Sequence, residues 1–424
     1  MHSWIGARLS ILFFIVCFSG TLATLSHEMD WLFISEIRAT GNLGNWAARN
    51  TIVENFKKNY PNASMDFWLR TDEPYLCDII YKSDSGERSY VFANPYTGKI
   101  QGEAKLTFQR FFRDLHYFLF IPFQIGHFTV LIFGFLLLLS LITALVFYKT
   151  WWRKLFELHT GKGALVFFRS LHRLIGLWSV PFTLLFSITG IWYFMERTNI
   201  AGISTISNPK KPRVTTAVSF ENGDSEDMDF SDIDYNRAVA EAERAIPGLR
   251  AGDILPPKSK TDVIYISGEG KVPLVRQRAN RVYLDPTTYK PIKVQDARDI
   301  GTTMYINDIA DPLHFGYWGG LVTKIIWFFL GLGISSLVLS GIWIRAKRKA
   351  TQRKAKKQSV MGIWHYINWG VCSIFWFFMY YILIDRYRVS GSALLVITAG
   401  WIIFLATAYY LFVIRLKRVI ASAI

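Results

Sequence analysis

The chain has 424 residues, of which 51% are hydrophobic, and its formal net charge at pH 7 is +16. A soluble chain of this length would form two or three domains, but the apolar composition and positive mean hydropathy predict several membrane spans instead. The positive charge lies mainly in short loops beside apolar stretches, where it sets membrane topology, which argues against nucleic-acid binding. The three cysteines are too few for a disulfide framework. The chain has no CxxCH motif, so covalently attached c-type haem is not indicated.

Six apolar stretches are long enough to cross a membrane core of about 30 Å. In chain order they cover 4–26, 125–148, 174–195, 321–344, 363–384 and 392–414. The first resembles a signal peptide, since Arg8 precedes an apolar run, but it lacks a small-residue cleavage site and a near-copy recurs later. We therefore predict a retained span, and a fold made of an all-α membrane bundle of about six helices with two small extracytoplasmic α+β domains.

The segments between these stretches differ in charge. Loops 149–173 and 345–362 are rich in lysine and arginine and are predicted to be cytoplasmic, whereas charges nearly balance in 27–120 and 197–320, as expected of translocated domains. Both termini are then cytoplasmic. The predicted spans lie within segments 1–26, 121–148, 174–196, 321–344, 363–384 and 392–414.

The chain repeats a unit of span, external domain and span. His2, His172 and His365 open spans one, three and five, and a Leu-His-aromatic triplet precedes spans two and four at His116 and His314. The last two spans resemble a third unit without its external domain. This repetition makes equivalent positions in separate units comparable.

The external domains also repeat. Each begins with a predicted amphipathic helix that ends near a proline, and strand-like runs follow before an Asn-Pro or Asp-Pro turn. The helices are predicted at 45–58 and 234–246, the strands at 64–69, 88–93, 263–267 and 281–284, and the turns at Asn94 and Asp285. The polar stretch 207–229 is predicted to be a linker.

Several short motifs together resemble the PepSY-associated transmembrane family over about residues 1–345. They are His2-Ser-Trp-Ile-Gly, Phe18-Ser-Gly-Thr through His27-Glu28, His172-Arg-Leu-Ile-Gly-Leu-Trp, Ser187-Ile-Thr-Gly190, and Leu313-His314 before Ser340-Gly-Ile-Trp343. The two proline turns resemble those of small PepSY domains. The chain departs from the family pattern in having spans five and six, and in carrying Met195 where the first unit has His27.

The resemblance implies a protein of the bacterial inner membrane with two PepSY-like domains in the periplasm. Members of the family include ferric-siderophore reductases with b-type haems in the bundle. The implied activity is therefore the reduction of ferric iron or a ferric siderophore outside the membrane. The chain has no nicotinamide, flavin or P-loop motif, so its electrons would come from a cytoplasmic partner or the quinone pool.

Seven of the eight histidines lie at the predicted membrane boundaries. Near the cytoplasmic side are His2, His172 and His365; near the outer side are His27, His116, His127 and His314. Polar groups near a membrane core are costly, and imidazoles at equivalent positions of repeated units favour axial ligation of haem over simple anchoring. We predict haem b, two per chain, and interpret His159 as a solvated loop residue.

The cytoplasmic pair is predicted to contain His172, with His2 or His365 as its partner. Arg8, Arg173 and Lys324 lie near span ends, where they either pair with haem propionates or extend towards lipid headgroups. His172 is the strongest candidate ligand, because it opens a clearly defined span of the core.

The outer pair has two alternatives. His127 can face His27, or His116 can pair with His314 by pseudo-symmetry. His116 and His127 would share a helix face, because eleven residues make about three turns, but Pro122 between them predicts a kink.

Two other functions compete with electron transfer. One is a non-enzymatic binding or regulatory membrane protein whose histidines only anchor the span ends. The other is a siderophore or metal permease, against which the spans show few internal acids and few signs of broken helices.

Overall fold

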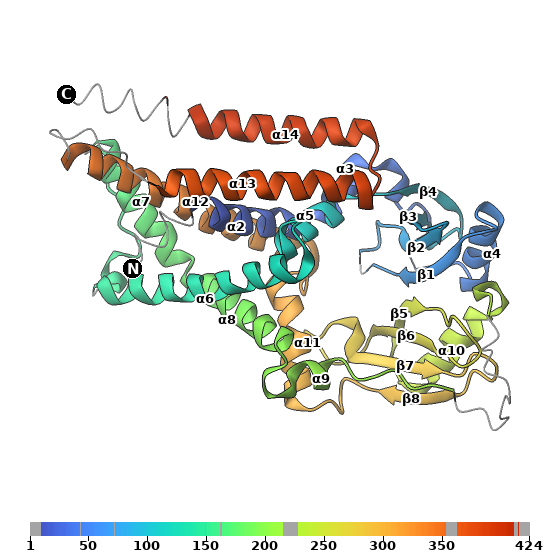
Figure 1. Ribbon diagram of the computed structural model, residues 1–424. Coiled ribbons are helices and arrows are strands. Elements are labelled where there is room, and N and C mark those ends of the chain that lie inside the picture. Colours follow the sequence, from blue (N-terminus) through green and yellow to red (C-terminus); the bar gives the residue numbers. More distant parts are fainter. Residues whose placement is uncertain are drawn as a thin grey trace. The chain divides into compact units, whose positions relative to one another are not determined.

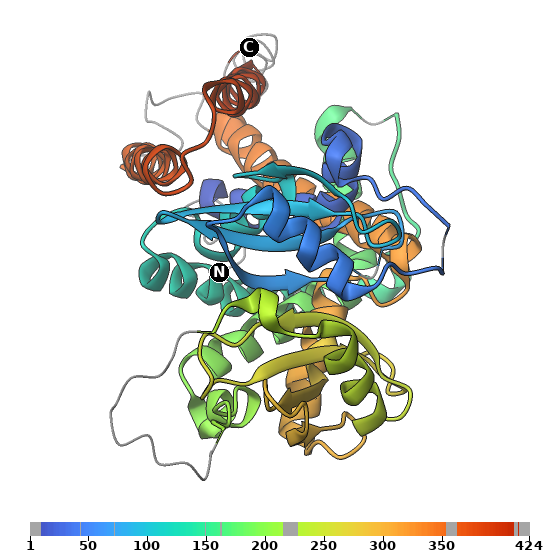
Figure 2. The ribbon, with the colours of Figure 1, turned by 90° about the vertical axis from the view of Figure 1, so that its right-hand side faces the viewer.

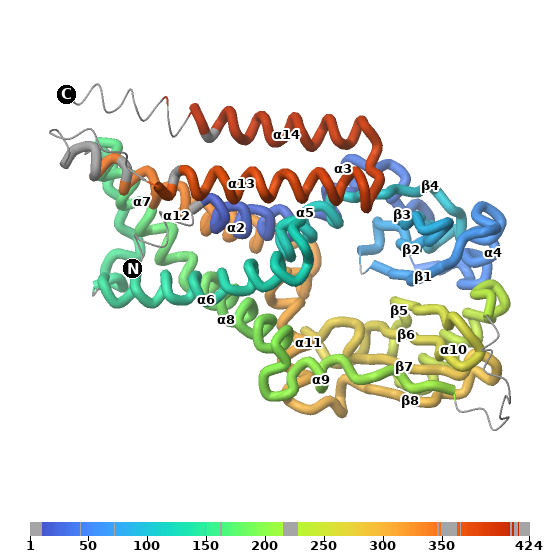
Figure 3. The backbone as a smooth tube through the Cα atoms, viewed as in Figure 1, coloured from blue at the N-terminus to red at the C-terminus, as the bar shows by residue number. Residues whose placement is uncertain are grey.

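The computed structural model describes residues 10–42, 44–71, 73–148, 150–161, 163–214, 228–352, 363–410 and 414 (Figure 3). The chain divides into two compact units. The membrane unit comprises Met1–Leu25, Gln109–Phe194 and Val322–Ile424, and the external unit, named after its predicted location, comprises Ser26–Phe108 and Met195–Leu321.

The membrane unit is built of apolar helices (Figure 1). They are α2 (Ser10–Thr24), α5 (Phe108–Phe118), α6 (Phe123–Phe147), α7 (Ala164–Trp178), α8 (Val180–Arg197), α12 (Gly320–Gln352), α13 (Trp364–Tyr381) and α14 (Gly391–Tyr409). A 3₁₀ turn, η2 (Trp151–Lys154), lies before α7, and a π-helical turn, η6 (Ile382–Arg386), extends α13.

Several of these helices can cross a membrane. Among the described residues, three are long and apolar enough, Phe123–Phe147, Gly320–Arg345 and Tyr366–Arg386, and the count rises to five if each of two bent pairs is one span. Helix α14 is apolar but shorter. The prediction of several spans is therefore confirmed, whereas the number six is not.

The bent pairs are a feature that the sequence did not predict. Ile11–Thr24 and Ser26–Phe33 meet at 62°, and Ala164–Trp178 and Val180–Arg197 meet at 59°. In the second pair Pro181 lies in the first turn of α8, where its missing N–H breaks no helical hydrogen bond, while its ring prevents α7 from continuing. The break at Ser179 thus falls inside the third predicted span, whereas the break at Leu25 falls at the end of the first.

Small residues bring the membrane helices close together. A Cβ placed on Gly134 of α6 would lie 3.2 Å from the Gly190 carbonyl carbon of α8, and one on Gly331 of α12 would lie 2.5 Å from Thr21 Oγ1 of α2. Aromatic pairs fill the remaining space, for example Phe13 with Phe133, whose ring centroids are 5.4 Å apart. In lipid the hydrophobic effect does not drive helices together, so close packing of their backbones stabilises the association instead.

The external unit contains one antiparallel sheet (Figure 2). In the described residues its eight strands have the order β4-β3-β2-β1-β5-β6-β7-β8. The strands are β1 (Ser64–Leu69), β2 (Asp78–Asp84), β3 (Glu87–Ala93), β4 (Ile100–Ala104), β5 (Arg250–Leu255), β6 (Ile264–Glu269), β7 (Asn280–Leu284) and β8 (Pro291–Gln295). Each repeat supplies four consecutive strands.

The two predicted external domains are not confirmed as two units, because each repeat contributes one half of this sheet. The two repeats join where β1 pairs with β5, with Trp68 opposite Ile254, and they form one compact unit. The physical reason is that each four-stranded meander alone would leave β1 or β5 with an open row of backbone donors and acceptors. Pairing the two edges removes both.

Helices complete the external unit. They are α3 (Ser26–Phe33), α4 (Arg49–Asn59), α9 (Ile203–Ser207), α10 (Tyr235–Ala245) and α11 (Thr302–Phe315), with 3₁₀ turns η1 (Ser35–Ile37), η3 (Ile200–Gly202), η4 (Phe230–Asp232) and η5 (Gln277–Ala279). Helices α4 and α10 share one hydrophobic core with both halves of the sheet, which includes Phe56, Trp68, Ile254 and Val282.

The N-termini of α4 and α10 cap each other. Asn50 Oδ1 accepts the Tyr235 backbone N–H at 2.8 Å, and Asn236 Oδ1 accepts the Arg49 backbone N–H at 2.7 Å. Each side chain satisfies a donor that the first turn of a helix leaves without an intrahelical partner. The two repeats therefore stabilise one another locally as well as through the sheet.

Replacement of Asn50 by alanine is expected to lower the free energy of unfolding by about 1 kcal/mol, because it removes the acceptor of the Tyr235 N–H while Asp234 still accepts the Arg237 N–H of the same helix. The measurement is the thermal unfolding of the detergent-solubilised chain, followed by tryptophan fluorescence. Asn62→Ala, in the exposed loop after α4, is the control and should leave the midpoint unchanged. Equal midpoints for Asn50→Ala and the wild-type chain would show that the reciprocal cap contributes little.

Candidate imidazole sites

His172 lies on α7 and contacts the C-terminal half of α12. Its Nδ1 is 2.8 Å from Ser340 Oγ, and the Ser340 hydroxyl donates to the Ser336 carbonyl at 2.8 Å. The serine oxygen therefore accepts the hydrogen bond from the imidazole. Gly341 lies beside the ring, and a Cβ there would be 3.5 Å from His172 Cε1, an ordinary contact.

His116 lies on α5 against α2. Its Nδ1 donates to the Val16 carbonyl at 2.9 Å. The ring rests on Gly20, where a Cβ would lie 2.7 Å from His116 Cε1 and 2.9 Å from Nδ1. Only glycine leaves room for the imidazole in this position.

The two histidines occupy different levels of the membrane unit. Thr21, next to Gly20, contacts Gly331 of α12, whereas His172 contacts Gly341 of the same helix. Ten residues of α-helix rise by about 15 Å. His116 and His172 are therefore separated by roughly half of a membrane core of about 30 Å.

His127 closes the corner between α5 and α6. The predicted kink at Pro122 is a complete break: α5 ends at Phe118, Leu119 and Phe120 have positive φ angles, and Pro122 precedes α6. His127 is 4% exposed, and its Nδ1 donates to the Tyr117 carbonyl at 3.2 Å. Its ring stacks at 7° on Phe123. These contacts are those of a packing residue, and they are also compatible with a role of His127 as a ligand.

The three histidines share one tautomer-setting arrangement. A carbonyl or a hydroxyl oxygen accepts a hydrogen bond from Nδ1 in each, so the neutral ring carries its lone pair on Nε2. Metal-ligating histidines are held in the same way, because a hydrogen bond from the other nitrogen fixes the ring's orientation and tautomer.

The other predicted ligands are placed differently. His27 and His314 belong to the external unit: His27 Nδ1 is 3.3 Å from Glu73 Oε1, and His314 packs edge-on against Phe315. His2 lies outside the described residues, and only the backbone of His365 is described, in α13. The alternatives His172 with His2 or His365, His127 with His27, and His116 with His314 all stay predictions.

The neighbourhood of His27 is polar and acidic. Tyr75 donates to Glu28 Oε1 at 3.0 Å. Burial raises the pKa of the Tyr75 phenol, and the carboxylates of Glu28 and Glu73 raise it further. At neutral pH Tyr75 is therefore a hydrogen-bond donor, not an anion.

The cations near the span ends are held by protein groups where they are described. Arg173 Nη2 donates to the Glu157 carbonyl at 2.9 Å and Nη1 to the Tyr148 hydroxyl at 3.2 Å. Lys324 is 5% exposed. Arg8 lies outside the described residues. The arrangement of Arg173 favours neither propionate pairing nor free extension to headgroups.

A cluster near His116 was missed by the sequence interpretation. Asp114, only 1% exposed, pairs with Arg110 Nε at 2.7 Å and accepts a hydrogen bond from the Tyr387 hydroxyl. Tyr387 follows the π-helical turn η6, so the cluster ties the α13–α14 hairpin to α5. Nothing local in the sequence indicates this contact, because Asp114 and Tyr387 are far apart along the chain.

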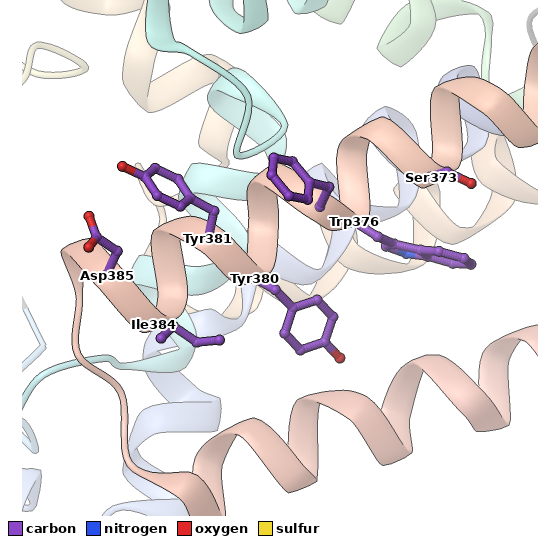
Figure 4. A pocket seen from close by; sticks show the side chains of 7 residues that line it. Ser373, Trp376, Tyr380, Tyr381, Ile384 and Asp385 are labelled. Carbon is purple, nitrogen blue, oxygen red and sulfur yellow. The ribbon is translucent and has the colours of Figure 1, made fainter.

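Helix α13 also carries an open groove of about 710 Å³ (Figure 4). It is lined by one stripe of the helix, namely Ser373, Trp376, Phe377, Tyr380, Tyr381, Ile384 and Asp385. Tyr380 bonds Thr398 Oγ1 of α14 at 2.6 Å. The lining is mainly aromatic and contains no histidine, so it contributes nothing to the imidazole sites.

Within the described ranges, no group of three or more His, Cys, Asp or Glu side chains is arranged to hold a metal ion. Haem does not require such a group, since the macrocycle supplies four nitrogens and the protein adds only one or two axial ligands. The described part of this chain contains single imidazoles whose rings are oriented by a hydrogen bond at Nδ1.

Comparison with known proteins agrees with the motifs. No curated protein matches the chain. The model of the PepSY-associated TM region matches residues 1–348, which include both repeats and end within α12, so α13 and α14 lie beyond the match. The chain is a membrane protein that belongs to the PepSY-associated transmembrane family.

Proposed function

We propose that this protein is a haem-dependent electron carrier of the bacterial inner membrane, which reduces ferric iron or a ferric siderophore on the periplasmic side. Its electrons come from a cytoplasmic donor or the quinone pool. The observation that supports this proposal most strongly is the pair His116 and His172. Both have a fixed Nδ1, both lie beside a glycine, and about 15 Å of α12 separates their levels.

The residues fit b-type haem chemically. Ligation requires a neutral imidazole with a defined Nε2 lone pair, and the Val16 carbonyl and Ser340 hydroxyl set that tautomer. When bound, haem b supplies a one-electron couple between ferric and ferrous iron.

Two levels of ligation match the task of moving charge through a bilayer. His172 would bind the haem nearer the predicted cytoplasmic side, and His116 the haem nearer the outer side. The external unit would then hold the ferric substrate.

The purified protein is expected to show b-type bands in its reduced-minus-oxidised spectrum and roughly two haems per chain by pyridine haemochrome assay. His116→Ala and His172→Ala should each lose about half of this haem. His159→Ala is the matched control, because His159 pairs with Glu157 at 2.6 Å in a loop, and it should retain all of it. Reoxidation of the reduced protein by a ferric chelate tests the final step.

A colourless protein after haem-replete expression would contradict the proposal. The chain would then be interpreted as a binding or regulatory protein whose external unit recognises a partner. Retention of both haems in His116→Ala and in His172→Ala would instead show that other histidines are the ligands.

A further inference from the structure

Helix α3 has its polar and apolar sides reversed. Ser26 and Asp30 are 3% and 1% exposed, while Trp31, Leu32 and Phe33 are 38%, 57% and 69% exposed. Asp30 Oδ1 accepts the Phe108 backbone N–H, and Glu28 bonds Tyr75. A helix that faces water would bury its apolar side, so the outer side of α3 is suited to an apolar environment.

The position of α3 indicates which environment this is. The helix starts at Ser26, directly after α2 ends at Thr24, and bends away from α2 by 62°. From Leu25 to Phe33 the chain rises by only about 12 Å, so all of α3 lies within about this distance of the end of the preceding span. The interfacial layer of a bilayer is roughly 5–7 Å thick on each side of the core.

The second repeat also exposes apolar side chains at the equivalent place. Segment η3–α9 begins three residues after α8 ends at Arg197. Ile200 and Ile206 are 46% and 44% exposed there, while Ile203 and Ser207 pack inward at 4% and 0%. Two independent segments of the repeat thus present apolar side chains just beyond a span.

Arg38 adds a feature typical of headgroup depth. Its guanidinium donates to the carbonyls of Trp31 and Leu32 at 2.7 and 2.9 Å and lies 5.1 Å from the Trp31 ring centre. Tryptophan and arginine together are favoured where apolar chains meet lipid headgroups.

We infer that α3 and η3–α9 are interfacial segments that bind the outer leaflet, with Trp31, Leu32, Phe33, Ile200 and Ile206 at the boundary between headgroups and acyl chains. Apolar faces of this kind typically enter roughly 5–10 Å into that boundary.

The test uses nitroxide labels on the full chain in vesicles of phosphatidylcholine and phosphatidylglycerol. Leu32→Cys and Ile206→Cys carry the labels, and labelled wild-type chain gives the background from its own cysteines. Ser85→Cys, at the β2–β3 turn, is the aqueous control. Relaxation by oxygen, which concentrates in lipid, is compared with relaxation by a water-soluble nickel chelate.

Labels at Leu32 and Ile206 are expected to relax more with oxygen than with the nickel chelate, and the Ser85 label to show the reverse. The inference is overturned if either apolar site behaves like Ser85. It is also overturned if either site is shielded from both reagents, since a second copy or a protein partner would then cover it. This readout requires no haem, so its failure is distinct from failure of the proposed function.

Discussion

Asp78→Ala is expected to destabilise the external unit by about 3–5 kcal/mol, because it leaves buried guanidinium groups without a counter-charge. Asp78 is 1% exposed. It accepts hydrogen bonds from Arg70 Nε at 3.0 Å and Nη2 at 2.7 Å, and from Trp68 Nε1 at 2.9 Å. Arg49 Nη1 lies 3.7 Å from the same carboxylate. One carboxylate thus serves two cations and an indole.

The environment of Arg49 explains why this loss should be large. The pKa of the Arg49 guanidinium is lowered to about 9 by burial and, to a smaller extent, by the neighbouring charge of Arg70, while Asp78 opposes both effects. Arg49 also donates to the Ala251 carbonyl of β5 at 2.7 Å. Disturbing this group therefore weakens the junction between the repeats as well as the first repeat.

Thermal unfolding and limited proteolysis of the detergent-solubilised chain measure this effect. Asp84→Ala is the matched control, since Asp84 lies at the other end of strand β2 and bonds only the adjacent Ser85 among the contacts described. Asp78→Ala should expose cleavage sites in both repeats, whereas Asp84→Ala should not. An Asp78→Ala chain as stable as the control would show that Arg49 and Arg70 find other partners.

Gly20→Ala is expected to remove about half of the haem, in the same way as His116→Ala. The new methyl group would stand 2.7 Å from His116 Cε1, closer than carbon atoms can approach, so the ring must leave its place on α2. Its hydrogen bond to the Val16 carbonyl is then lost, and with it the orientation of Nε2.

Two other glycines provide matched controls for this change. Gly341→Ala places its methyl 3.5 Å from His172 Cε1, an ordinary contact, and Gly370 on α13 has open space around it. Both variants should keep the full haem content in the pyridine haemochrome assay. Full haem content in Gly20→Ala would show that the His116 ring is not held against α2 in the loaded protein.

Local chemistry was predicted well from the sequence. Asn94 Oδ1 accepts from Tyr96 and Thr97, and Asp285 Oδ1 accepts from Thr287 and Thr288, as the two proline turns implied. The predicted helices at 45–58 and 234–246 correspond to α4 and α10. These features depend on residues that are neighbours in the chain, so one segment is enough to reveal them.

Features that depend on distant contacts were not predicted. The β1–β5 junction pairs Trp68 with Ile254, and no local pattern states which edge a strand will find. Likewise, repetition identified His116 and His172, but not the Val16 carbonyl, Gly20 or Ser340 that hold them. The ligand pairs themselves remain predictions.

The junction between β1 and β5 also has a consequence for synthesis. At about 5–20 residues per second, a ribosome needs roughly 10–40 s to pass from Trp68 to Ile254. During this interval β1 has emerged but its partner strand does not yet exist, and two further spans are still being inserted. Until then the first half of the sheet has an unpaired edge at β1, which makes the nascent chain most vulnerable to aggregation before its second repeat is synthesised.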